Sequence, residues 1–257
     1  MEKKYIVIGI VSIILIGTVA SIGFFFFYED IFEETIQPSD NDERYFRKFI
    51  VGNHNFSSIA YGKVNNTYWP LEIGYRIVLL GEEEGETIQV NITVLNRTEM
   101  VGSIETRVVE EREIEGGELV EISYNYVALC NETNDLVYFG ELSNEYEDGS
   151  IVSTEGSWRA DTPGNYPGIL MPGNFIVGDR YYQEYAPEEA LDRAENIGIG
   201  FTFQTPAGLF NKCVIVEESN ELEPPRIEYK VYAQGIGMIA DETLVITKYE
   251  YVTGGIN

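Results

Sequence analysis

The stretch that decides the fold is residues 104–129, IETRVVEEREIEGGELVEISYNYVAL. Two runs of strand-forming residues flank a Gly-Gly pair at positions 116 and 117, which is the pattern of a β-hairpin. The second run alternates strictly between an apolar face and a polar face. The apolar face holds Val120, Ile122, Tyr124, Tyr126 and Ala128, and the polar face holds Glu121, Ser123 and Asn125. This period of two predicts a strand that is buried on one side.

The same pattern extends over most of the chain. From Arg44 onward, turn signals recur about every 10–15 residues between short alternating runs, which is typical of all-β proteins. Further arms are expected at 75–80, 87–95, 136–142, 149–154, 197–203, 209–217, 227–233 and 243–252. Two segments break the rhythm. Residues 159–173 contain three Pro-Gly pairs and predict a long loop, and residues 187–194 favour a strand arm over one short helix.

These runs predict an all-β fold. About ten antiparallel strands from one chain make a sheet large enough to curl. One-sided alternation means that one face is buried, against a second sheet or within the curvature of the sheet itself. We therefore expect a curved antiparallel meander or half-barrel, with a β-sandwich as the alternative.

Composition excludes several classes of protein. The chain has 257 residues, with 43 acidic against 17 basic side chains and a formal net charge of −26. Such a chain repels polyanions, so we expect no nucleic-acid partner. One histidine and two cysteines exclude histidine-rich zinc sites and iron–sulfur clusters. The acidic runs Glu82-Glu83-Glu84 and Glu110-Glu111 are interpreted as solvated turns or strand ends.

The N-terminus predicts a membrane anchor. Residues 5–28 carry no charge, and about 20 apolar residues suffice to span a bilayer as a helix. Lys3 and Lys4 precede the segment and acidic residues follow it, which places the N-terminus in the cytoplasm and the rest outside it. A cleaved signal peptide is the alternative. The predicted organisation is an anchor over 1–28, an acidic spacer over 29–43 and an extracytoplasmic β domain over 44–257.

Two further features are consistent with an extracytoplasmic location. Cys130 and Cys213 form a candidate disulfide, because two cysteines outside the cytoplasm are commonly paired. The alternative is that Cys213 is a small core residue. Five Asn-x-Ser/Thr sequons are candidate glycosylation sites: Asn55, Asn65, Asn91, Asn96 and Asn131. In the strand expected around Asn91, this residue lies on the face opposite Ile88, Val90, Ile92 and Val94, where a glycan can be accommodated.

An ordered set of short segments over residues 66–240 resembles a group of exported prokaryotic proteins of unknown function. The segments are TYWPLE (67–72), IETRVV (104–109), VYFGE (137–141), YEDG (146–149), PGILMP (167–172), VGDRYYQEY (177–185), PAGLFNKC (206–213) and YAQGIG (232–237). The last two are also similar to hairpins of β-rich envelope proteins with lipoprotein-carrier-like half-barrels. The resemblance implies a fold and supplies no catalytic residues. The acidic spacer and Cys130 depart from the group, so a disulfide is not implied by it.

No catalytic, cofactor or metal site is assigned from the sequence. His54 is the sole histidine and is interpreted as a surface residue, and the Gly235-x-Gly237-x-x-Ala240 match to a dinucleotide motif lacks the following helix, so we interpret it as a turn. We expect a membrane-anchored binding or envelope-structural domain without a cofactor, with a lipid or other apolar molecule as the ligand and no identifiable protein partner. The alternative is a hydrolase that acts on envelope polymers through a carboxylate pair.

Overall fold

A computed structural model describes residues 46–83, 85–222 and 227–255. The anchor predicted over 1–28 and the spacer predicted over 29–43 lie outside the described residues. Within the described ranges, no helix is long and apolar enough to cross a membrane.

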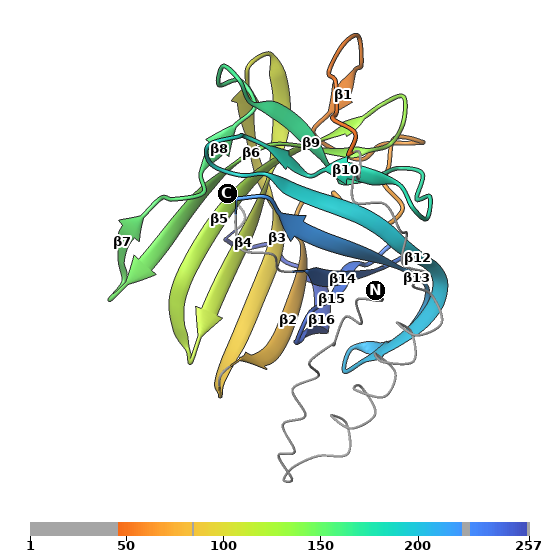
Figure 1. Cartoon of the computed structure of the whole chain (residues 1–257). Coiled ribbons are helices and arrows are strands. Elements are labelled where there is room, and N and C mark those ends of the chain that lie inside the picture. Colours follow the sequence, from red (N-terminus) through yellow and green to blue (C-terminus); the bar gives the residue numbers. More distant parts are fainter. Residues whose placement is uncertain (1–45, 84, 223–226, 256–257) are drawn as a thin grey trace, which may run out of the picture. The chain divides into compact units, whose positions relative to one another are not determined.

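The described chain forms sixteen strands (Figure 1). The first eight are β1 (Phe56–Ser57), β2 (Tyr75–Glu83), β3 (Glu86–Val101), β4 (Ile104–Glu115), β5 (Glu118–Cys130), β6 (Leu136–Glu147), β7 (Ser150–Ser153) and β8 (Trp158–Arg159). The others are β9 (Tyr166–Met171), β10 (Arg180–Tyr182), β11 (Glu184–Tyr185), β12 (Asp192–Thr205), β13 (Gly208–Asn220), β14 (Glu228–Ala233), β15 (Gly237–Asp241) and β16 (Leu244–Tyr251).

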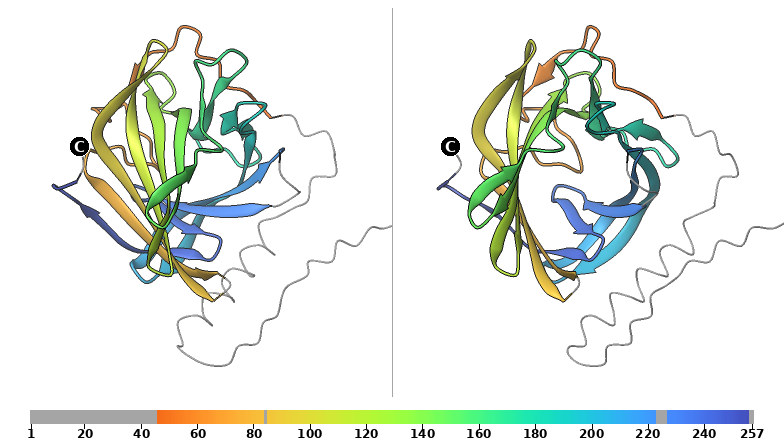
Figure 2. Two further views of the ribbon diagram at one scale, coloured as in Figure 1. Left: turned by 90° about the vertical axis from the view of Figure 1, so that its left-hand side faces the viewer. Right: turned by 60° about the vertical axis from the view of Figure 1, so that its left-hand side comes forward.

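Thirteen of these strands run around a nearly closed antiparallel barrel. Their order is β10-β12-β13-β14-β15-β16-β2-β3-β4-β5-β6-β9-β11, with β1 added to β5 and with β7 and β8 added to β6. Figure 2 shows the strands curving around a common interior. The long hairpin β4–β5 that the Gly-Gly pair predicts lies in the middle of this path, with Glu115 paired to Glu118 across the turn.

One short segment closes the barrel. Residues 180–182 pair with β12 through Tyr181↔Ala194, and residues 184–185 pair with β9 through Glu184↔Pro167. The same six residues therefore satisfy both edges of the sheet, which removes the unpaired edges that a half-barrel would leave. The backbones approach very closely here, because a Cβ built on Gly168 would lie 1.9 Å from the Gln183 carbonyl oxygen.

Residues 46–49 fasten this closing segment from outside. The Arg47 backbone N–H donates to the Arg180 carbonyl at 3.0 Å, and Tyr182 N–H donates to the Arg47 carbonyl at 3.1 Å. The Arg47 guanidinium binds Asp179 through two hydrogen bonds of 2.7 and 3.1 Å. The Lys48 ammonium lies 3.6 Å from the centre of the Tyr185 ring. The seam of the barrel is thus held by backbone pairing, one bidentate ion pair and a cation–π contact.

The fold confirms the all-β class and differs from the expected half-barrel in being nearly closed. The hairpins at 75–95 and 104–129 are confirmed as β2–β3 and β4–β5. The loop expected over 159–173 is wrong in part, since it contains β9, and this strand gives the sheet the edge that β11 completes. Residues 187–191 form a turn before β12, and the turn at 234–236 is followed by the unexpected strand β15. Local sequence did not reveal these short strands, because Pro167-Gly168 within β9 and Gly235 and Gly237 around the start of β15 are turn signals.

We predict that Gly168→Ala destabilises the protein by about 2–3 kcal/mol or more, because the new methyl group would force β9 away from the Gln183 carbonyl. The free energy of unfolding of the full-length protein, measured by urea titration, checks this. Gly254→Ala is the matched control, since nothing lies within 4 Å of its Cβ position, and it should change stability by less than about 0.5 kcal/mol. Equal stability of the two variants would contradict the tight seam.

Candidate functional site

The interior of the barrel holds a partly open cavity of about 350 Å³. Its wall is built from β3–β6 on one side and from β12–β15 on the other, with the closing segment between them. Seven carboxylates but only one cation, Lys230, line it. The carboxylates are Glu111, Glu121, Glu141, Glu184, Asp192, Glu218 and Glu228. Charged side chains in a protein interior are normally paired with opposite charges. Structural ion pairing therefore does not explain this excess of carboxylates.

Strand register places several carboxylates side by side in the β4–β6 wall. Glu113 on β4 lies directly opposite Glu121 on β5, and Glu121 lies directly opposite Glu145 on β6. Like charges in directly opposed positions destabilise a sheet, so packing energetics alone would not select this row. Two residues along β4 on the same face, Glu111 faces Ser123 and points into the cavity.

Polar partners hold most of the acidic side chains in place. Glu121 Oε1 accepts a hydrogen bond from Ser143 Oγ at 3.0 Å and another from Ser123 Oγ. Glu141 Oε2 accepts one from the Tyr138 hydroxyl at 3.2 Å. Glu111 accepts no hydrogen bond from any described residue, although it lies within the barrel wall and faces the cavity. A ligand in the cavity would be the natural partner of this carboxylate.

The single cation is already neutralised. Lys230 Nζ lies 2.8 Å from Glu218 Oε2 and 3.7 Å from Asp241 Oδ2, and Glu218 also accepts a hydrogen bond of 2.8 Å from Gln183 Nε2. Burial opposes the charge on Lys230, but Asp241 and Glu218 together raise its pKa well above the usual value. Lys230 is therefore an ammonium group paired within the β13–β15 wall, and no second cation among the described residues lines the cavity beside the carboxylates of β4–β6.

Proton affinity in the cavity is high. Burial raises the pKa of Glu111 to about 8, with Lys230 opposing the shift and Asp241, Glu141 and Glu121 adding to it. Burial and the neighbouring Glu121 likewise raise the pKa of Glu113 to about 7. Burial raises the pKa of Asp241 to about 6, against the influence of Lys230. Near neutral pH, Glu111 in the cavity and Glu113 and Asp241 in the surrounding wall are therefore protonated for part of the time.

The rest of the lining is aromatic and apolar. Trp69, Tyr138 and Tyr232 face the cavity together with Ile92 and Met238. The Trp69 and Tyr232 rings lie 5.8 Å apart, and Tyr232 is almost completely buried. A cavity that combines carboxylates with aromatic faces suits a positively charged group attached to a carbon skeleton.

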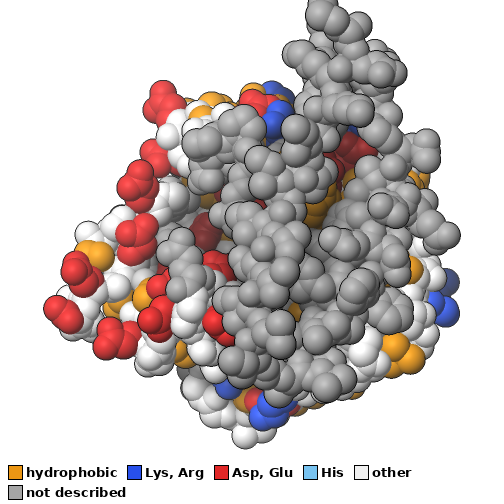
Figure 3. All heavy atoms as spheres, turned by 60° about the horizontal axis from the view of Figure 1, so that its bottom comes forward, with side chains coloured by type: hydrophobic (Ala, Val, Ile, Leu, Met, Phe, Trp, Pro, Cys, Tyr) orange, Lys and Arg blue, Asp and Glu red, His pale blue; other side chains and the backbone are white. Residues whose placement is uncertain are grey.

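One end of the barrel is also strongly acidic outside. The β2–β3, β4–β5 and β6–β7 turns meet at this end and expose their acidic residues, which are Glu82, Glu83, Glu86, Glu115, Glu118, Glu147 and Asp148. Figure 3 views the molecule from below and shows Asp and Glu gathered along one side. Such a rim raises the local concentration of cations.

The interpretation of Glu110-Glu111 as a solvated turn or strand end is wrong. Both residues lie within β4, and Glu111 faces the cavity. The signal was present in the sequence, because Glu121, Ser123 and Asn125 form a clean polar face on the next strand. That polar face was expected to be exposed to solvent, whereas in the nearly closed barrel it lines the cavity. Glu82 and Glu83 are exposed at the end of β2, as expected.

The possible Cys130–Cys213 disulfide is not seen, and both cysteines are free and buried. Cys130 ends β5 and Cys213 lies in β13, so six strands separate them along the sheet. Neighbouring strands are about 4.8 Å apart and the two residues belong to different walls, whereas a disulfide needs Cα atoms within about 7 Å. The Cys213 thiol lies 3.5 Å from the Phe210 carbonyl, and burial raises its pKa to about 11.

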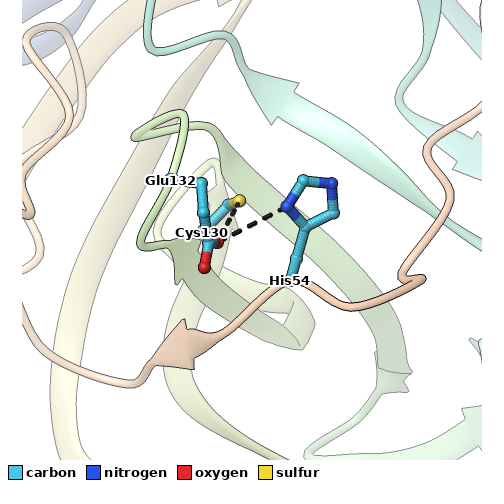
Figure 4. A group of neighbouring side chains, drawn as sticks. All are labelled: His54, Cys130 and Glu132. Carbon is cyan, nitrogen blue, oxygen red and sulfur yellow. Dashed lines mark hydrogen bonds and ion pairs between the residues drawn. The ribbon is translucent and has the colours of Figure 1, made fainter.

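The five sequons lie at or near the surface. Asn55, Asn65 and Asn96 are exposed, and Asn91 and Asn131 are half-buried. Asn91 lies beside Gln89, whose amide donates to it at 3.1 Å, on the face opposite the buried Ile88, Val90, Ile92 and Val94. Glycosylation at these positions stays a prediction. His54 lies at the end of the barrel opposite the acidic turns, next to Cys130 and Glu132 (Figure 4).

Comparison with known proteins identifies no relative. A scan against protein families found no match, and searches of curated proteins and of solved structures found none either. The resemblance noted in the sequence is thus supported only as far as a β-rich, barrel-like sheet.

The free cysteines predict two reactive thiols per chain when the protein is unfolded without reductant. In the native protein Cys213 should label slowly with maleimide, because it is buried and its thiol keeps its proton. Mass spectrometry after labelling counts the modified residues, and Cys213→Ala should leave one. An unfolded, unreduced wild-type chain that takes up no label would show that the two cysteines are bonded.

The raised pKa of Glu111 predicts a stability change that depends on pH. The folded protein binds the Glu111 proton more tightly than the unfolded chain does. The contribution of Glu111 to the free energy of unfolding is therefore most favourable below its ordinary pKa of about 4.5. This contribution falls as pH rises and reaches its minimum above about pH 8. Glu111→Gln should raise the free energy of unfolding by about 2–4 kcal/mol at pH 9 and change it little at pH 4.5.

Urea titrations of the ligand-free protein at the two pH values measure this difference. Glu118→Gln, on an exposed turn, is the control and should shift stability by less than about 0.5 kcal/mol at either pH. A Glu111→Gln variant that is destabilised at pH 9 would mean that the carboxylate is compensated in the folded state.

Proposed function

We propose that this protein is a membrane-anchored, extracytoplasmic binding barrel that takes up a small organic cation. The observation that carries the proposal is the cavity in the barrel interior, which is lined by seven carboxylates and one lysine that is itself paired. The ammonium group of the ligand would lie against Glu111, Glu121 and Glu141. Its carbon skeleton would pack on Trp69 and Tyr232, where aromatic faces favour a neighbouring positive charge.

The acidic lining argues against the lipid or other apolar ligand expected from the sequence. Apolar ligands are held by cavities with few polar groups, because every carboxylate that a hydrocarbon covers loses its hydration without a partner. An ammonium group compensates the same carboxylates. Binding would release the proton held by Glu111, so affinity for a cation should rise with pH between about 6 and 8.

A hydrolase is the second candidate. It is favoured by the juxtaposition of a protonated carboxyl group, Glu111, with other carboxylates, since general acids and bases require proton affinities tuned near neutrality. However, a cavity of about 350 Å³ suits a small molecule and not a polymer chain. The cation-binding role therefore accounts for more of the site.

The proposed location depends on the sequence. Residues 5–28 and the preceding lysines support a single span with the N-terminus in the cytoplasm. The net charge of −26 and the sequons are compatible with a barrel displayed outside the cell membrane.

The binding proposal predicts that 2-phenylethylamine binds and that its neutral isostere 2-phenylethanol binds at least about tenfold more weakly, because only the amine pairs with the carboxylates. Isothermal titration at pH 8 measures both affinities, and Trp69 in the cavity wall provides a fluorescence readout. Glu141→Gln should weaken amine binding about tenfold, and affinity should fall when the titration is repeated at pH 6.

Glu118→Gln, outside the cavity, should leave the amine affinity unchanged. Equal affinity for the amine and the alcohol would favour an apolar ligand instead. A small-amine site would be contradicted if neither compound binds at millimolar concentration and native mass spectrometry shows that the purified protein carries no bound amine.

A further inference from the structure

The register of a short strand pair brings together three side chains that the sequence keeps apart. β1 pairs with β5 through Phe56↔Cys130 and Ser57↔Leu129. The pairing continues one step beyond the strands, because Asn131 N–H donates to the Asn55 carbonyl at 2.8 Å. Side chains two residues apart share a face of a strand, so position 54 comes to lie opposite position 132, on the same side as Cys130. His54, Cys130 and Glu132 therefore converge.

The three ligand atoms are close to one another (Figure 4). His54 Nδ1 lies 3.4 Å from Glu132 Oε2, and Cys130 Sγ lies 3.5 Å from the same oxygen. All three atoms lie within 4.8 Å of one another. Among the described residues this is the one group of histidine, cysteine and acidic side chains with such spacing.

These separations match tetrahedral coordination. With metal–ligand distances of about 2.1 Å for nitrogen and oxygen and about 2.3 Å for sulfur, the tetrahedral angle gives about 3.4 Å between nitrogen and oxygen and about 3.6 Å between sulfur and oxygen. The observed distances of 3.4 and 3.5 Å agree with both. The third pair, the His54 imidazole nitrogen and the Cys130 sulfur, lies within 4.8 Å.

Neighbouring groups orient each ligand. The Asn55 backbone N–H donates to both Glu132 carboxylate oxygens, at 3.1 and 3.2 Å, and its side-chain amide donates to Oε1 at 2.8 Å. The Phe49 ring lies 5.7 Å from the His54 ring. Cys130 is fixed by its N–H bond of 2.9 Å to the Asp135 carbonyl. Outer contacts of this kind hold ligands in place before a metal arrives.

We propose that His54, Cys130 and Glu132 form a binding site for a borderline divalent metal ion of the Zn²⁺ class. A thiolate, an imidazole and one carboxylate together suit zinc, whereas calcium and magnesium prefer oxygen ligands alone. The buried thiol closes the inner side of the site, and the His54 and Glu132 side chains are 36% and 41% exposed. The fourth position thus faces solvent and is open to water or to another ligand. The thiol proton passes to solvent when the metal binds.

Cobalt(II) is the probe for this site, because it takes the place of zinc and gives an intense near-ultraviolet absorption band when a thiolate binds it. Titration of the full-length protein with Co²⁺ should produce this band at one equivalent, and Zn²⁺ should abolish it by displacement. Cys130→Ala should remove the band. Cys213→Ala is the matched control and should retain it, since Cys213 is the other buried cysteine and lies in β13.

His54→Ala provides a second test that does not disturb the core, because His54 is partly exposed. It should weaken Zn²⁺ affinity about tenfold or more while leaving the thermal unfolding midpoint of the metal-free protein unchanged. A band that persists in Cys130→Ala, or an affinity unaffected by His54→Ala, would overturn the proposal. Co²⁺ binding without a thiolate band would also overturn it and would place the ion among carboxylates such as those of the cavity.

Discussion

The structure depends on the double pairing of one six-residue segment. Residues 180–185 add to β12 on one side and to β9 on the other, and the absence of a side chain at Gly168 allows the backbones to meet. Because both edges of a long curved sheet are satisfied at one place, one face of every strand is turned inward. Whatever the sequence places on those faces becomes the interior of the protein. Residues 46–49 then fasten the closure from outside.

The chain uses that interior at a cost to its stability. The interior of a barrel of this size could be filled by apolar side chains. On the β4–β6 wall, however, Glu113, Glu121 and Glu145 oppose one another across neighbouring strands. Burial raises the pKa of Glu111 on the same wall to about 8. A stability-driven sequence would replace such residues, and their presence is the kind of local conflict that marks binding sites. The uncompensated charge is therefore the strongest functional signal in the molecule.

The sequence predicted much of the fold and little of the site. Strict alternation and the Gly-Gly turn were sufficient to predict the β4–β5 hairpin, and eight further strands were expected near their observed positions. Closure could not be predicted, because β9, β10 and β11 are only two to six residues long and pair with distant segments. Glu111 and Glu121 were recognisable as members of polar faces, but alternation does not reveal which face points inward. His54 and Glu132 are 78 positions apart, so only the register of β1 with β5 shows that they are neighbours.

The closing segment also belongs to the cavity. Gln183 and Glu184 line the cavity and lie in the seam, with Gln183 bonded to Glu218 on the opposite wall. Ligand binding in the cavity and closure of the barrel would therefore be thermodynamically linked. A ligand that binds more tightly to the closed barrel would stabilise the pairing of residues 180–185 with β9, and this pairing would increase ligand affinity by the same factor. Separation of residues 180–185 from β9 would open the barrel at its seam and would also remove Gln183 and Glu184 from the cavity lining. The same backbone segment therefore controls both access to the cavity and contact with a bound molecule.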